Sequence, residues 1–90
     1  MVQLIEVVKN TRNYELRDVF VNPQHVVMLR EDHATRTAIN EGKAIEGVDP
    51  RQKYTRVTVD NGTTGSQFIV VGAPGLIETK LKSGKQLLNG

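Results

Sequence analysis

The sequence contains no cysteine and no tryptophan, and aromatic residues make up only 4% of its 90 residues. Without cysteine the chain has no disulfide framework, no thiolate metal ligand and no thiol nucleophile. No apolar run approaches the ~20 residues that span a bilayer, and the first residues lack the basic and apolar regions of a signal peptide. These absences favour a cytoplasmic protein that makes no contact with a membrane.

Charge of one sign is also scarce. The chain has 12 Lys and Arg against 10 Asp and Glu, a net charge of +2, which is far below the excess of a typical DNA-coating protein. A single domain of this length buries only about 60–65% of the surface that its unfolded chain exposes. Association of several copies would therefore be a natural source of additional stability.

Residues that carry chemistry are present, but their spacing does not suit catalysis or metal binding. The two histidines, His25 and His33, do not form the HExxH pattern of zinc enzymes. The sequence also lacks a GxSxG nucleophile motif and a phosphate-binding GxxxxGK[ST] loop. We therefore predict a protein that is not an enzyme, has no catalytic residue, metal or cofactor, and works by binding or assembly.

The pattern of apolar residues predicts a mostly β domain. Pro74 followed by Leu76, Ile77 and Leu81 predicts a short C-terminal helix that closes at Gly84. Runs of β-branched and alternating apolar residues predict strands over residues 2–8, 14–21, 25–30, 53–59 and 66–71, the last two joined by a hairpin turn. We assign residues 1–84 to one domain and residues 85–90 to a flexible tail.

The segment between the third and fourth predicted strands, residues 31–50, is long for a connection inside a small domain. A short helix over residues 34–40 is one reading of it, although Thr35 and Thr37 are weak helix formers. The other reading, which we favour, is a long mobile loop.

Five twisted strands with one short helix would most easily close as a small, strongly bent barrel. Residues 26–29 and 68–71 are apolar on both sides of their strands, and we expect both Phe20 and Phe68 in the core. In a small barrel one side of each strand faces water. We therefore expect either the helix or a neighbouring subunit to cover the second side.

Nucleic-acid binding needs exposed aromatic rings with basic neighbours. Tyr54 meets this condition, because Lys53 and Arg56 flank it on a strand side predicted to be exposed. Stacking on such a ring contributes about 1–3 kcal/mol per base. Both residues also have an interpretation without a ligand. Tyr54 is then an ordinary tyrosine on the surface of a strand, and His25 is a capping or turn residue. The candidate contacts are Asn22, Gln24, His25, Lys53, Tyr54 and Arg56.

Three segments carry a family resemblance: VFVNPQHVVML (19–29), YTRVTVDNG (54–62) and FIVV (68–71). With the long loop between them, they resemble a family of small cyanophage proteins from ocean metagenomes. That family has the Sm-like fold of the Sm, LSm and Hfq proteins. Asp60-Asn61-Gly62 stands where Sm proteins carry an Arg-Gly pair, so fold and ring assembly carry over but individual RNA contacts do not.

The resemblance implies a five-stranded Sm-like barrel with a C-terminal helix and a long loop between strands three and four. It also implies a homo-oligomeric ring, from pentamer to heptamer, that binds RNA or single-stranded DNA in nucleic-acid processing. The protein would then be encoded by a phage and act in the cytoplasm of its host.

A second resemblance competes with the first. Phe20-Val21-Asn22-Pro23, the apolar strand after it, and the Thr-rich strand that ends in Asn61-Gly62 are similar to small bacterial flagellar FlbD-like proteins. This similarity extends over residues 1–82 and implies a structural or protein-interaction module that binds no nucleic acid.

Overall fold

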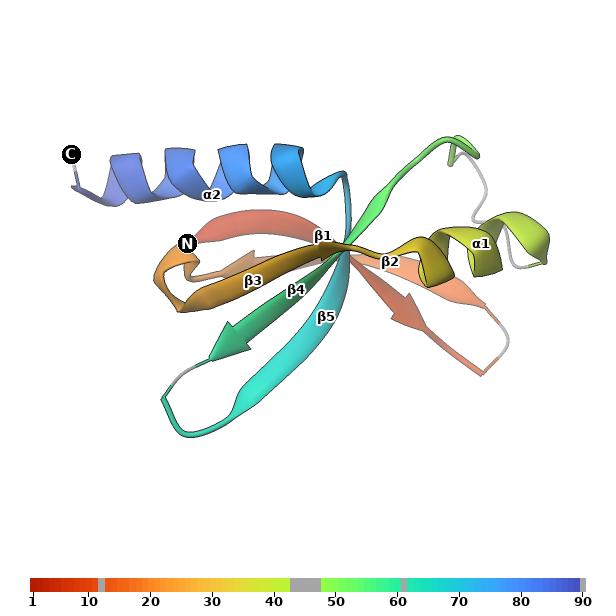
Figure 1. Cartoon of the computed structure of the whole chain (residues 1–90), viewed down its shortest axis with the longest axis horizontal. Coiled ribbons are helices and arrows are strands. Elements are labelled where there is room, and N and C mark those ends of the chain that lie inside the picture. The colour runs from red at the N-terminus through yellow and green to blue at the C-terminus, as the bar shows by residue number, and fades with distance from the viewer. Residues whose placement is uncertain (12, 43–47, 61, 90) are drawn as a thin grey trace.

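The computed structural model describes residues 1–11, 13–42, 48–60 and 62–89, and their side chains as far as residue 83 (Figure 1). A 3₁₀ helix, η1 (Pro23–His25), joins the second strand to the third. The other elements are β1 (Val2–Lys9), β2 (Tyr14–Val21), β3 (Val26–Glu31), α1 (His33–Glu41), β4 (Tyr54–Asp60), β5 (Gly65–Val71) and α2 (Pro74–Asn89). The mostly β domain predicted from the sequence is confirmed.

The strands form one antiparallel sheet in the order β2-β1-β5-β4-β3. β2 and β3 are its two edges and do not pair with each other within the described residues, so the sheet is open where the sequence predicted a closed barrel. The connection between the edges gives the physical reason. Pro23 has no N–H to donate, and the His25 N–H donates to the Asn22 carbonyl oxygen at 3.0 Å instead of to a ladder.

The open sheet is nevertheless coiled. In a flat sheet of five strands the edges would lie about 19 Å apart, because neighbouring strands are about 4.8 Å apart. The turn of 3₁₀ helix that links Val21 to Val26 rises only about 2 Å per residue. Both valines also pack into the same hydrophobic core. The sheet therefore curls until its two edges approach each other at η1.

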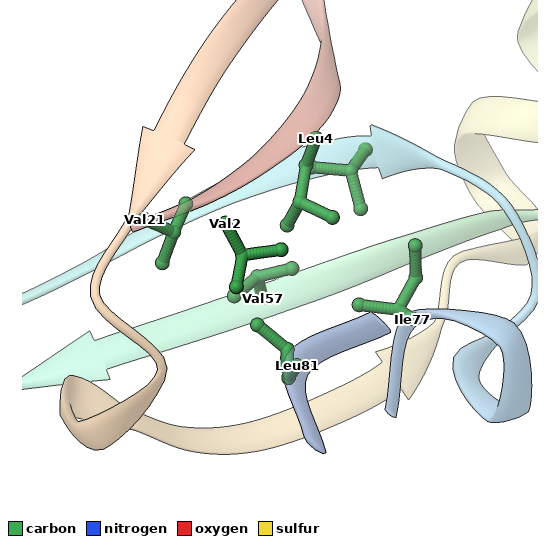
Figure 2. Close-up of a cluster of buried hydrophobic side chains, with 7 residues drawn as sticks. Val2, Leu4, Val21, Val57, Ile77 and Leu81 are labelled. Atoms are coloured by element: carbon green, nitrogen blue, oxygen red, sulfur yellow. The ribbon is translucent and has the colours of Figure 1, made fainter. Parts of the chain in front are cut away.

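Helix α2 covers the inner side of this coil, which we call the α2 face. Ile77 and Leu81 lie one helical turn apart and are both buried against the sheet. Gly72, at φ +125°, makes the turn that leads into the helix. The helix continues to Asn89, so the predicted end at Gly84 is wrong. The buried core on this face consists of Val2, Leu4, Val21, Val57, Val70, Ile77 and Leu81 (Figure 2).

The predicted loop over residues 31–50 contains helix α1, so the loop interpretation is wrong for that part. Asp32 is the N-cap: its carboxylate accepts the Thr35 backbone N–H at 3.0 Å and the Thr35 hydroxyl at 2.9 Å. Thr35 thus supports the helix that its propensity disfavours. Residues 43–47 of the segment lie outside the described residues.

Helix α1 packs on the opposite side of the sheet, the α1 face, where Ile39 is buried against Val7 and Tyr54. It covers only part of that side. Strand register places Phe20 opposite Gln3, on the α1 face, and Phe20 is 62% exposed. The prediction that Phe20 belongs to the core is therefore wrong. The exposed large apolar residues that register assigns to this face are Ile5, Leu16, Phe20 and Met28.

Candidate nucleic-acid interface

The structure distributes the predicted contact residues over different places. Asn22, Gln24 and His25 form the corner at η1. Asn22 and His25 line one hollow and Arg56 lines a second, on the α1 face. Lys53 lines a third, with Asp49 and Arg51 but without an aromatic side chain among the described residues. Lys53, Tyr54 and Arg56 therefore do not form the single contact surface that the sequence predicted.

Tyr54 does not occupy the exposed position predicted for it. The residue is 1% exposed and packs with Val7 and Ile39. Burial raises the pKa of its phenol, and its hydroxyl has no hydrogen-bond partner among the described residues. The prediction that Tyr54 is exposed is wrong because α1, which lies in the segment predicted as a loop, packs on it through Ile39.

The corner between β2 and η1 supplies an exposed aromatic ring in its place. Phe20 contributes there, with Asn22 and His25, to the lining of a hollow of about 250 Å³. The other walls include Val19, Val21, Val59 and Phe68 of the α2 face, whereas strand register directs the Phe20 ring to the α1 face. An aromatic ring beside a histidine and an amide is suited to an unstacked base, because the ring offers a stacking surface and the polar groups can bond base edges.

Hydrogen bonds within the corner fix its shape. The Asn22 side-chain oxygen accepts the Gln24 backbone N–H at 3.0 Å and so caps η1. This cap uses the Asn22 side-chain oxygen and not its N–H₂ group. Gln24 and His25 are exposed. The sequence suggested a capping role for His25, but the N-cap of η1 is Asn22.

Sequence reasoning missed Phe20 because Val19-Phe20-Val21 is an apolar run. The alternating direction of side chains along a strand could have predicted that Phe20 is exposed. Val21 is buried and Val19 packs on the α2 face, and successive side chains of a strand point to opposite sides. The ring between them must therefore face the other way.

A second polar hollow, of about 340 Å³, lies on the α1 face beside the first turn of α1. Arg56 is oriented there from two sides: its guanidinium donates to Asp32 Oδ2 at 3.3 Å and to Gln67 Oε1 at 3.3 Å. Arg30 stands directly opposite Arg56 in the β3–β4 ladder. Arg30 carries no motif in the sequence, and only the strand register reveals its position.

The carboxylate that faces Arg56 is ionised under ordinary conditions. Burial alone raises the pKa of Asp32, but the hydrogen bonds from Thr35 and the nearby Arg56 guanidinium together outweigh burial and hold that pKa below its usual value. The hollow therefore combines a buried negative charge with two guanidinium groups at its surface.

Two further properties of the described residues bear on function. No three His, Asp or Glu side chains lie close enough together there to hold a metal ion. None of the helices in that part of the chain has the length and apolar character needed to cross a membrane.

No protein-family model matches the chain, and neither the curated proteins nor the solved structures include a match to it. The resemblances to Sm-like and FlbD-like proteins therefore stay predictions.

Proposed function

We propose that this protein binds RNA or single-stranded DNA without catalysis, as an Sm-like ring of identical subunits. The observation that carries the proposal is the Phe20 side chain, 62% exposed at the β2–η1 corner, where Asn22 and His25 line an adjoining hollow. Large apolar side chains that remain in water beside polar groups commonly mark binding surfaces. Each Phe20 phenyl ring would offer one stacking platform to the RNA or DNA strand.

Stacking by itself supports a useful affinity only when several subunits act together. One base on one aromatic ring contributes about 1–3 kcal/mol, which corresponds to weak binding for a single copy. A ring would present the same corner several times to one strand, and each added contact would benefit from a raised effective concentration. The net charge of +2 per chain also adds up over the subunits, so the assembled ring attracts the phosphate backbone more strongly than one chain does.

The two sheet edges support the assembly. β2 and β3 leave their outer N–H and C=O groups without strand partners among the described residues, and such edges readily pair with another chain. Pairing β2 of one subunit with β3 of the next is a head-to-tail contact, which closes into a ring when the rotation between subunits fits. Because η1 holds both edges at one corner, each subunit would place its Phe20 near such a junction.

The test combines light scattering with fluorescence anisotropy on the intact chain. The proposal expects a pentamer to heptamer at tens of micromolar protein, and saturable binding of labelled oligo-U or oligo-A at about 50 mM salt that weakens by about 200 mM. A monomer would overturn ring assembly. A ring that binds neither oligonucleotide at low salt would overturn nucleic-acid binding.

One observation favours a second candidate, a protein-interaction module. Ile5, Leu16 and Phe20 are each at least 41% exposed on neighbouring strands of the α1 face, so they form an apolar area suited to a protein partner. Leu16→Ser separates the two functions. It should leave oligonucleotide binding unchanged if the Phe20 corner alone contacts the strand, whereas an interaction module binds no oligonucleotide in either form.

A further inference from the structure

Arg30 and Arg56 form a like-charge pair across two strands. Directly opposite residues of an antiparallel ladder have Cβ atoms about 4.5–5.5 Å apart, and like charges in that position destabilise the pair. Arg56 contacts Asp32, but the Arg30 guanidinium donates to the Met28 sulfur at 3.7 Å, and no carboxylate of the described residues forms an ion pair with it. Arg30 therefore carries a positive charge that no carboxylate of the described residues pairs with.

We propose that the hollow between these two arginines binds a phosphate group. Guanidinium groups match phosphate oxygens in planar, two-pronged hydrogen bonds. A phosphate monoester carries about −1.5 to −2 charges at neutral pH, so it would compensate two guanidiniums where a single carboxylate would not. The repulsion between Arg30 and Arg56 then becomes an attraction that both share with the ligand.

Arg56 is already held in position for such a ligand. Asp32 and Gln67 each take one of its terminal nitrogens, at 3.3 Å. A guanidinium has five N–H donors, so donors remain for a phosphate. Asp32 itself offers little competition, because its side chain is 4% exposed and both of its oxygens accept hydrogen bonds from Thr35.

The lining of the hollow supplies further groups. The Thr58 hydroxyl oxygen is buried and has no hydrogen-bond partner among the described residues. Glu31 also lines the hollow, and its carboxylate pairs with His33 Nδ1 at 3.4 Å. The walls thus provide two guanidinium groups beside two carboxylates, of which Asp32 pairs with Arg56 and Glu31 with His33.

The phosphate has two chemical sources: a small phosphate monoester or inorganic phosphate, or the backbone of a nucleic-acid strand, whose diester phosphates carry one negative charge each. The second source rests on the proposed function, and the first does not. The arginine hollow and the Phe20 hollow share no lining residue. A test with inorganic phosphate therefore judges the arginine site even if the strand-binding proposal fails.

The experiment is a titration of the ¹⁵N-labelled full chain followed by NMR, with inorganic phosphate, oligo-U and a chloride series at matched ionic strength. Saturable shifts should appear at the arginine side-chain N–H signals and at the amides of Arg30, Arg56 and Thr58. The Arg30→Gln variant should bind phosphate about ten-fold more weakly. Lys80→Gln removes the same charge from the exposed surface of α2 and should bind like the wild type.

Arg56→Lys is the second variant, because it keeps a cation beside the buried Asp32 while removing the planar donor pair. It should also weaken binding. Shifts with inorganic phosphate alone would identify a small phosphate ligand, and competition between phosphate and oligo-U for the same signals would identify a strand backbone. Shifts no larger than those with chloride, or unchanged affinity in Arg30→Gln, would overturn the proposal.

Discussion

The Asp32 carboxylate and the Arg56 guanidinium, 24 positions apart in the sequence, meet at 3.3 Å. Asp32 is at the same time the N-cap of α1, so a single side chain fixes the helix to β4 and orients the arginine. The helix in turn buries Tyr54 and leaves Phe20 exposed. The surface available to a ligand is therefore set by one polar contact beneath the first turn of α1.

Asp32→Asn tests that contact. Asparagine caps a helix about as well as aspartate, so the change mainly removes the negative charge beside Arg56 and the second acceptor for Thr35. We expect the free energy of unfolding at neutral pH to fall by about 1 kcal/mol. Urea denaturation of both proteins measures it.

The effect of Asp32→Asn should depend on pH. The pKa of Asp32 is lowered in the folded protein, so the carboxylate stabilises the fold above the unfolded pKa of about 3.9 and loses this effect as pH falls through the folded value. The difference between wild type and variant should therefore shrink in acid. Asp49→Asn, at an exposed carboxylate paired only with Arg51, is the control. An equal loss in both variants would argue against the Asp32 account.

Tyr54→Phe should maintain or raise stability. The substitution removes a buried hydroxyl without a hydrogen-bond partner among the described residues, and a buried polar group in that state costs about 1–3 kcal/mol. We expect a gain of up to about 1 kcal/mol, since the phenyl ring keeps its contacts. Denaturation at neutral pH measures it, with Tyr14→Phe as the control for loss of a hydroxyl elsewhere.

Alkaline pH should enlarge the gain from Tyr54→Phe. Burial raises the pKa of Tyr54 in the folded state, so above about pH 10 the unfolded chain loses this proton before the folded one does. Wild-type stability then falls with rising pH, and the variant lacks this contribution. A destabilised Tyr54→Phe would mean that the hydroxyl has a partner after all.

Gly72→Ala should destabilise the fold strongly. Gly72 has φ +125°, and a Cβ placed there would lie 3.1 Å from Ile77 Cδ1, in the core under α2. We expect a loss of about 1–3 kcal/mol. Gly62→Ala has a similar backbone requirement, at φ +97°, but its Cβ would meet nothing within 4 Å. Thermal unfolding should show a smaller loss of stability for Gly62→Ala than for Gly72→Ala. Equal losses would mean that the contact with Ile77 does not contribute to the effect.

Local patterns in the sequence predicted the strands and the start of α2 well. Thr55, Val57 and Val59 alternate as a half-buried strand should, and Thr55 and Val57 are fully buried. The hairpin between β4 and β5 follows from its turn residues. These features depend on neighbours in the chain, so they can be read without knowledge of the fold.

The features that failed depend on contacts between distant residues. Helix α1 rests on Asp32 as cap and on Ile39 against the sheet, which outweigh the weak propensity of its threonines. Tyr54 is buried only because that helix is there. The opposition of Arg30 and Arg56 is a consequence of strand register, which includes a bulge between Val26 and Met28 that no turn motif announces.

The most direct test of the account is oligo-U binding by Phe20→Ala and Val27→Ala, followed by fluorescence anisotropy with light scattering on each variant. Both side chains are 62% exposed and apolar, but only Phe20 is among the residues that line the hollow with Asn22 and His25. We predict that Phe20→Ala weakens binding about ten-fold or more, as loss of one stacking ring requires, while Val27→Ala binds like the wild type. Equal affinities for all three assembled proteins would contradict the account.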